Sequence, residues 1–165
     1  MVLQHDVAVV VDSSSCLPPD MLRKWNITVV PHELIIDHRS FRDGVDIQPD
    51  EFYQLLAQGN PPSLTTAAPQ PRQFLEAFLE AGERAPNVLC LTLSAQFSAT
   101  YRSARAAVDL ANGRLSKTKV KVIDSQAAAG GSGLIALAAA RWAAGGFNLD
   151  RVVRGVEQLV SSQGS

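Results

Sequence analysis

The sequence predicts an α/β fold, a three-layer α/β/α arrangement around a mainly parallel sheet. Short runs of β-branched residues alternate with longer segments of helical period, the pattern of parallel strands joined by crossover helices. Two of the runs, residues 7–11 and 88–93, are almost continuously apolar, as strands covered on both faces should be. We therefore predict that these two strands lie at the centre of the sheet.

The elements follow from these patterns. Strands are expected at residues 7–11, 27–30, 33–36, 88–93 and 120–123, and helices at 19–25, 49–57, 71–82, 97–110, 133–144 and 149–160. Proline stands early in the first three helices, and Asn148 can cap the last. The third helix carries Phe74, Leu75, Phe78 and Leu79 on one face, which we expect to pack inward. Residues 60–63 (NPPS) cannot continue a helix and mark a loop that leads to Thr65 and Thr66.

Composition and charge narrow the class of protein. The chain has 165 residues, of which 46% are hydrophobic and 19% charged, and this is typical of one compact globular domain and argues against disorder. Its 15 basic and 16 acidic residues give a formal net charge of -1, without the basic excess of a nucleic-acid-binding protein. We expect no nucleic-acid partner.

Other residue types predict no metal site and no membrane span. Cys16 and Cys90 have no Cys or His at metal-ligand spacing, and Cys90 is expected in the core. The three histidines form no H-E-x-x-H pair and are expected on the surface or in turns. The first twelve residues read as a strand and not as a signal peptide, which favours a cytoplasmic protein. The run of small and apolar residues 133–140 is too short to span a bilayer.

Hydroxyl groups collect where the predicted strands end. The first strand runs into residues 12–15 (DSSS), a central strand into 94–100 (SAQFSAT) and a later strand into 124–125 (DS), and Thr65 and Thr66 follow the proline-rich loop. In open α/β sheets ligands bind at the carboxyl ends of strands, where hydroxyls and helix N–H groups can hold a carboxylate or phosphate. Any one of these residues alone is better explained as a helix cap or turn residue. The cluster as a whole indicates an anion site.

Several blocks of the sequence resemble the DegV family. Residues 10–13 (VVDS) look like the opening T-D-S of that family, and residues 26–31 (NITVVP) are similar to its I-x-V-V-P strand. Residues 41–53, residues 66–69 (TAAP, where the family has T-S-Q-P) and residues 120–125 (VKVIDS) follow in family order. The most specific block is residues 93–104 (LSAQFSATYRSA), which is close to L-S-S-x-L-S-G-T-Y-Q-S-A.

The resemblance implies a carrier that encloses a long-chain fatty acid such as palmitate and holds its carboxylate with a Thr and a Ser. Carried over by motif, these are Thr66 and Ser98. The wider set of candidate ligand-binding residues is Thr66, Ser98, Thr65, Ala99, Thr100 and Ser13, and within the rim Asp12, Ser13 and Ser125 are second choices that more readily organise the loops. The resemblance also implies that a separate fatty acid kinase acts on the bound acid, and that the carrier has no chemistry and no cofactor of its own.

The sequence departs from the family pattern at three positions and in length. Ala67 and Ala68 replace polar residues near the head group, and Ala99 replaces a glycine. Family members have a second domain that covers the acyl chain. We therefore assign residues 1–147 to a DegV-type head-group-binding domain and residues 148–165 to a helix that would lead to a second domain.

Alternative functions have weaker support. Residues 131–136 (GSGLIA) match G-x-G-x-x-A, but they do not follow a strand directly, so small residues that allow close helix packing are the better explanation. Asp12 could be the nucleophile of a phosphotransferase, yet position 14 is Ser and not a second carboxylate. No G-x-S-x-G is present for a serine hydrolase. A nucleotide-dependent α/β enzyme therefore remains the alternative, together with a plain interaction domain.

Overall fold

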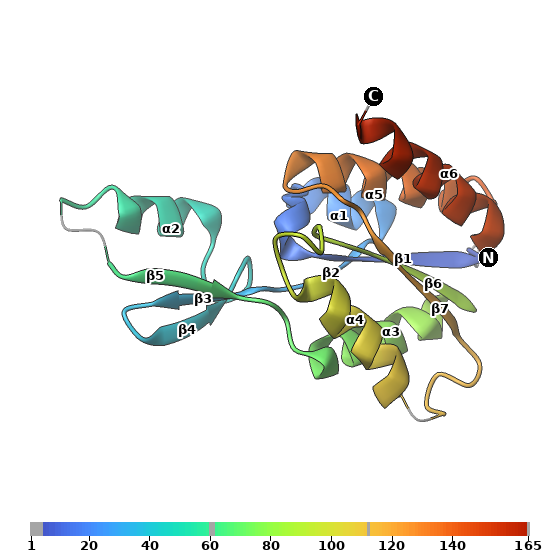
Figure 1. The fold of residues 1–165 in the computed structure, drawn as a ribbon, viewed down its shortest axis with the longest axis horizontal. Helices are drawn as coiled ribbons and strands as arrows, with labels where there is room; N and C mark the ends of the chain where they lie inside the picture. Colours follow the sequence, from blue (N-terminus) through green and yellow to red (C-terminus); the bar gives the residue numbers. More distant parts are fainter. Residues whose placement is uncertain (1–4, 60–61, 112, 165) are drawn as a thin grey trace.

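The computed structural model describes residues 5–59, 62–111 and 113–164, and it confirms the α/β class (Figure 1). In this part of the chain, four strands form a parallel sheet in the order β2-β1-β6-β7, and three more form an antiparallel sheet in the order β4-β3-β5. The strands are β1 (Val7–Asp12), β2 (Thr28–Val30), β3 (Glu33–Ile36), β4 (Arg39–Arg42), β5 (Leu64–Ala67), β6 (Asn87–Thr92) and β7 (Lys119–Asp124). The helices are α1 (Pro19–Trp25), α2 (Pro49–Leu56), α3 (Pro71–Arg84), α4 (Thr100–Leu110), α5 (Gly130–Ala144) and α6 (Leu149–Ser161), with short 3-10 turns η1 (Ser13–Ser15) and η2 (Ser162–Gly164).

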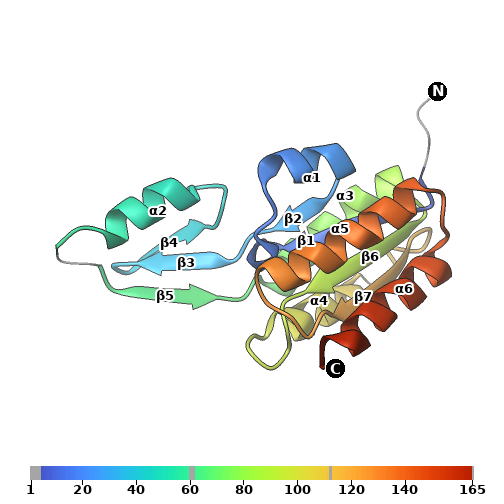
Figure 2. The ribbon, with the colours of Figure 1, turned by 90° about the horizontal axis from the view of Figure 1, so that it is seen from above.

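The parallel sheet lies between two layers of helices, as predicted. Helices α1, α5 and α6 cover one face and α3 and α4 cover the other (Figures 1 and 2). Strand β1 contributes Val7, Val9 and Val11 to the first core and Ala8 and Val10 to the second, because successive side chains of a strand point to opposite faces. The prediction that β1 and β6 are the central strands is confirmed.

Most helix starts follow the predicted local rules. The first three long helices have proline in the first turn, where the missing N–H would have no partner. The Asn148 side chain accepts a hydrogen bond from the Arg151 N–H at 3.0 Å and caps α6. Helix α3 buries Phe74, Leu75 and Phe78, as predicted from their spacing. Helix α6 buries Leu149, Val152, Val156 and Val160 in the core that α5 shares.

The antiparallel sheet and α2 form a lobe that projects from the parallel sheet (Figures 1 and 2). The predicted strand 33–36 is confirmed as β3, but it belongs to this lobe, and β4 and β5 were not predicted. Asp37 and His38 have φ of 46° and 66° and join Ile36 to Arg39 in a two-residue hairpin turn, a conformation that Asn-Gly more commonly provides. Strand β4 is polar and mostly exposed, so it lacks the apolar alternation that predicts a strand.

One predicted helix start differs in the structure, and one predicted loop is only partly described. Helix α4 begins at Thr100 and not at residue 97, because residues 94–98 form a turn in which the N–H groups of Phe97 and Ser98 both bond the Ser94 carbonyl. The loop predicted at residues 60–63 lies partly outside the described residues. Within the described ranges, no helix is both long and apolar enough to cross a membrane.

Candidate functional site

The carboxyl ends of the parallel strands meet at one edge of the sheet, and Asp12 connects two of the loops there. The carboxylate of Asp12 is 1% exposed. Its Oδ2 accepts from the Leu93 N–H at 2.7 Å, and its Oδ1 accepts from the Ser14 N–H at 3.0 Å and from the Ser14 hydroxyl. This single side chain therefore fixes the loop after β1 against the loop after β6.

The loop after β7 is attached to the same edge. Asp124 accepts from the Ala95 N–H at 3.2 Å and from the Gln126 N–H at 2.9 Å. The buried Ser125 hydroxyl accepts from the Ala127 N–H at 3.2 Å, and the Ser125 N–H donates to the Thr92 carbonyl at 3.1 Å. The three loops thus form one rigid rim around the strand ends.

A histidine links three hydroxyls on this rim. The Ser13 Oγ lies 3.2 Å from His32 Nδ1, His32 Nε2 lies 3.0 Å from Thr100 Oγ1, and Thr100 Oγ1 lies 2.7 Å from Ser98 Oγ. We call these four residues the His32 chain. It joins the ends of β1 and β2 to the start of α4, and it brings together three of the sequence-predicted site residues.

His32 itself was not predicted as a site residue. His32 was expected on the surface or in a turn: it does lie in the connection between β2 and β3, but its side chain is only 12% exposed, whereas His5 and His38 are exposed. Burial lowers the pKa of His32, against the opposing effect of the carboxylates of Asp12 and Asp43. The sequence does contain a signal, since His32 follows a predicted strand as Ser13 and Ser94 do, but an imidazole is not part of the hydroxyl pattern that predicted the site.

Ser98 lies two residues before the first residue of α4. Its Oγ accepts from the Thr100 N–H at 3.2 Å in addition to contacting the Thr100 hydroxyl, so this amide of the helix start is already bonded. The Ser98 side chain is half-buried and the neighbouring Ala99 is exposed. Ser98 is therefore partly open to solvent at the rim, and its Oγ lies within hydrogen-bond distance of both the amide and the hydroxyl of Thr100; either hydroxyl can donate to the other.

Thr65 and Thr66 lie on β5, in the projecting lobe. Thr66 pairs with Leu34 and Thr65 with Ile35, and both threonines are exposed. No hydrogen bond joins either one to the His32 chain among the described residues. Leu34 lies only two residues after His32, however, so Thr66 is on the end of β5 that approaches the rim.

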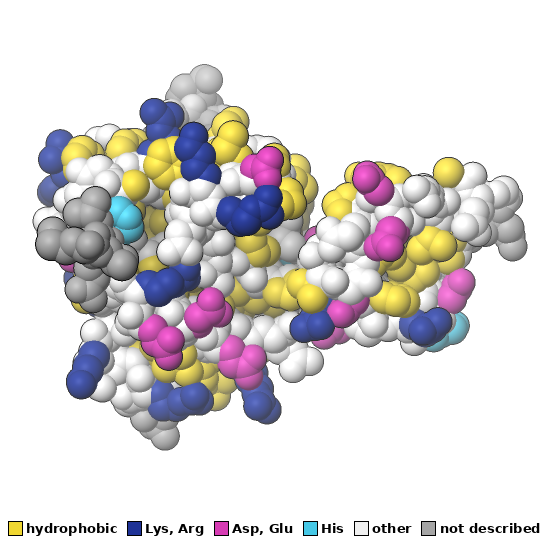
Figure 3. All heavy atoms as spheres, turned by 180° about the vertical axis from the view of Figure 1, so that it is seen from behind, with side chains coloured by type: hydrophobic (Ala, Val, Ile, Leu, Met, Phe, Trp, Pro, Cys, Tyr) yellow, Lys and Arg dark blue, Asp and Glu magenta, His cyan; other side chains and the backbone are white. Residues whose placement is uncertain are grey.

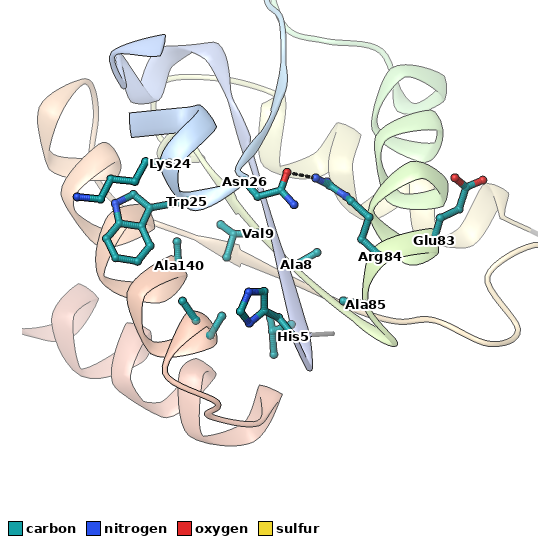
Figure 4. A pocket seen from close by; sticks show the side chains of 13 residues that line it. His5, Ala8, Val9, Lys24, Trp25, Asn26, Glu83, Arg84, Ala85 and Ala140 are labelled. Atoms are coloured by element: carbon teal, nitrogen blue, oxygen red, sulfur yellow. Dashed lines mark hydrogen bonds between the residues drawn. The ribbon is translucent and has the colours of Figure 1, made fainter. Parts of the chain in front are cut away.

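A pocket lies at the opposite edge of the sheet, where the parallel strands begin (Figure 4). It has a volume of about 610 Å³. Strand β2 pairs only with Val10–Asp12, which leaves the first residues of β1 open to this pocket. Arg84 donates to Asn26 Oδ1 and Thr28 Oγ1 at its rim. The pocket is distant from the predicted anion site, and it contains none of the candidate residues.

The geometry does not favour the nucleotide-enzyme alternative. A Cβ on Gly133 would lie 2.4 Å from the Ser15 carbonyl oxygen, so this glycine allows close packing of α5 on η1. The Asp12 carboxylate is buried and has three hydrogen-bond donors, which suits a structural role better than that of a nucleophile. Burial raises the pKa of both Cys16 and Cys90, so neither thiol is activated. The described residues hold no cluster of three or more His, Cys, Asp or Glu that could bind a metal.

The face of the molecule in Figure 3 shows no field of a single charge among the described residues. On the face in Figure 3, Lys and Arg side chains are interspersed with Asp and Glu over both the main body and the lobe. Such a mixed surface is unlike the basic stripe of a nucleic-acid-binding protein.

Fold and site together define an open α/β-sheet domain with a hydroxyl-lined rim at the carboxyl ends of its strands. A family model described as "Uncharacterised protein, DegV family" matches residues 6–165. The chain belongs to the DegV family. It is 37% identical over 154 residues to a DegV domain-containing protein of Caldanaerobacter subterraneus, covering 93% of this chain and 53% of the relative. A DegV domain-containing protein of Mycobacterium tuberculosis is also 37% identical, over 94% of this chain and 52% of its own length.

Solved structures agree with this assignment. A DegV family protein from Thermus thermophilus, described by its fatty acid binding, has a TM-score of 0.82 and 32% identity, over 94% of this chain and 54% of its own. A stearic acid-binding protein from Eubacterium ventriosum has a TM-score of 0.84 and 27% identity, over 92% of this chain and 52% of its own. The chain therefore spans about half the length of the relatives it matches.

Proposed function

We propose that this chain is the carboxylate-binding part of a long-chain fatty-acid carrier, with Thr66 and Ser98 at the carboxylate. The observation that carries the proposal is the half-buried Ser98 hydroxyl at the start of α4, which accepts from the Thr100 N–H at 3.2 Å and lies at the rim where the loops after the strands meet. Its support from outside the chain is the fatty acid binding of the Thermus thermophilus relative. A neutral hydroxyl suits this task because a hydrogen bond to a charged group is stronger than one between neutral groups.

Exposed apolar side chains beside the rim support the proposal. Phe97 is 73% exposed on the loop after β6, and Leu134 is 70% exposed on the first turns of α5. On the lobe, Tyr53, Val45 and Leu64 are also exposed. Large apolar side chains are typical of surfaces that contact a lipid or another protein where they gather in one contiguous patch. We assign them to contact with the acyl chain or with a covering domain.

Three further features belong to the same proposal. Residues 148–165 would lead to a second domain that covers the acyl chain, as the length of the relatives suggests. The bound acid would be presented to a separate fatty acid kinase in the cytoplasm, and the carrier would need no catalytic group or cofactor. Residues 1–147 would then form the domain that binds the head group.

Lipid extraction tests the binding claim directly. We expect an organic extract of the purified chain to contain long-chain fatty acids by mass spectrometry, and the delipidated chain to take up added palmitate. Hexadecanol is the matched control ligand, since it has the same acyl length without the carboxylate and should bind much more weakly. A lipid-free extract together with no uptake of palmitate would refute the binding claim for this chain.

A further inference from the structure

We propose that His32 is a positioning residue, which acts through Thr100 to turn the Ser98 hydroxyl proton toward a bound carboxylate. This inference rests on the proposed function and adds a regulator of the same site. It starts from the fact that a serine hydroxyl has a single proton. If that proton bonds Thr100, it is not available to a ligand.

We assign the direction of the His32 chain from its first member, because the donor in each of its contacts is set by the imidazole tautomer and by the rotation of the hydroxyls. The Ser13 Oγ accepts from the backbone N–H of His32 at 3.0 Å, and the same hydroxyl lies 3.2 Å from His32 Nδ1. With one contact accepted, the Ser13 proton is free to donate to Nδ1. A neutral imidazole that accepts at Nδ1 bears its proton on Nε2.

The remaining bonds then point one way. His32 Nε2–H donates to Thr100 Oγ1 at 3.0 Å, and the Thr100 hydroxyl donates to Ser98 Oγ at 2.7 Å. The Thr100 N–H donates to Ser98 Oγ as well, at 3.2 Å. Both lone pairs of Ser98 are thus filled, and its proton is directed away from Thr100.

The charges that face His32 leave this arrangement intact. Asp12 Oδ1 lies 3.7 Å from Nδ1, beyond hydrogen-bond distance, and it already accepts from the amide and hydroxyl of Ser14. Asp43 is the other carboxylate that acts on the ring. Burial lowers the pKa of His32, so the neutral imidazole on which the His32 chain depends predominates at neutral pH.

Two variants of His32 separate the positioning role from simple packing. A Gln side chain can place its amide N–H near the position of Nε2 and donate to Thr100, whereas Leu cannot. We expect palmitate affinity to fall roughly twofold to tenfold in His32→Leu and to stay close to the wild-type value in His32→Gln. Thr100→Val removes the next hydroxyl of the His32 chain, so its loss of palmitate affinity should match that of His32→Leu. Unchanged affinity in both His32→Leu and Thr100→Val would overturn the proposal.

A double-mutant cycle tests whether His32 acts through Ser98. In a Ser98→Ala background, His32→Leu should cause no further loss, because the proton that it positions is gone. Additive losses would contradict the proposal.

The imidazole tautomer provides a readout that needs no ligand. Nitrogen chemical shifts of His32 in the lipid-free wild-type chain should show the proton on Nε2. A proton on Nδ1 would overturn the proposal whether or not lipid binds. No palmitate uptake by a chain with the Nε2–H tautomer would instead overturn the proposed function, so the two failures are distinguishable.

Discussion

The Ser103 hydroxyl donates a hydrogen bond to the carbonyl oxygen of Pro69. Pro69 follows β5 and Ser103 lies on the first turn of α4, so this bond attaches the threonine-bearing segment of the lobe to the helix that follows Ser98. The two blocks that carry the predicted carboxylate ligands are therefore neighbours in space, although they are about 30 residues apart in the sequence.

Thr66 and Thr65 should differ in their effect on fatty-acid binding. Adjacent residues of a strand point to opposite faces, so only one of these two hydroxyls can face a ligand at the rim. We expect Thr66→Val to weaken palmitate binding by about 1.5–3 kcal/mol, the contribution of a hydrogen bond to a charged group. Thr65→Val is the matched control and should bind as wild type in calorimetric titration. The reverse result would assign the carboxylate to Thr65.

Ser98→Ala should weaken palmitate binding by a similar amount, about 1.5–3 kcal/mol, because it removes the proposed donor to the carboxylate. Ser116→Ala is the control, since Ser116 is exposed in the turn before β7, at the other edge of the sheet. Binding can be measured with a fluorescent fatty acid and competition by palmitate. If Ser98→Ala and Ser116→Ala bind equally well, Ser98 is not a ligand of the carboxylate.

The parallel core was predictable because its residues are constrained locally. Continuous apolar runs predicted the central strands, and proline and the Asn148 cap predicted helix starts. The lobe was less predictable because its strands bury little. Arg39–Arg42 has no apolar face, and its hairpin turn uses Asp37 and His38 in place of glycine. The pairing of β4 with β3 depends on tertiary contacts, which local sequence patterns do not encode.

The sequence predicted the position of the candidate site better than the hydrogen bonds that connect its residues. The rule that ligands bind at the carboxyl ends of strands led to Ser13, Ser98 and Thr100, which the structure joins through hydrogen bonds. The link between them is His32, 68 residues before Thr100. A contact over that separation depends on the order of the strands in the sheet, and the sequence alone does not specify that order.

Asp12 should contribute to stability through its three hydrogen bonds. Asp12→Asn presents an NH2 group to donors of Leu93 or Ser14, so at least one buried donor loses its acceptor. We expect the free energy of unfolding in urea to fall by about 1–3 kcal/mol. Asp109→Asn, at an exposed position on α4, should change it by less than about 0.5 kcal/mol. An equally small effect of Asp12→Asn would show that the loops hold their positions without this carboxylate.

The pair of Arg42 and Asp46 should give the lobe a stability that depends on pH. Side-chain hydrogen bonds from the Arg42 guanidinium, and a further bond from its backbone N–H, lower the pKa of Asp46 to about 2. A lowered carboxyl pKa stabilises the folded state above the unfolded pKa near 4, and this contribution is lost as the pH falls toward 2.

Carbon NMR of the Asp46 carboxyl should therefore titrate near pH 2 and move toward pH 4 in Arg42→Gln. Arg39→Gln, on the same strand, should leave the Asp46 titration unchanged. An Asp46 pKa near 4 in the wild-type chain would show that the ion pair does not persist in solution.

Gly133→Ala should destabilise the fold, because the new Cβ would lie 2.4 Å from the Ser15 carbonyl oxygen and 3.2 Å from the Leu17 side chain. Backbone atoms cannot move aside as a flexible side chain can, so α5 and η1 would have to separate, which should cost about 1–3 kcal/mol. Gly130→Ala, at the start of the same helix, has no atom within 4 Å of the new Cβ and should be neutral or slightly stabilising. Urea unfolding of the two variants checks this difference. Equal stability would mean that α5 can shift away from η1 without loss, and that close packing is not the reason for a glycine at position 133.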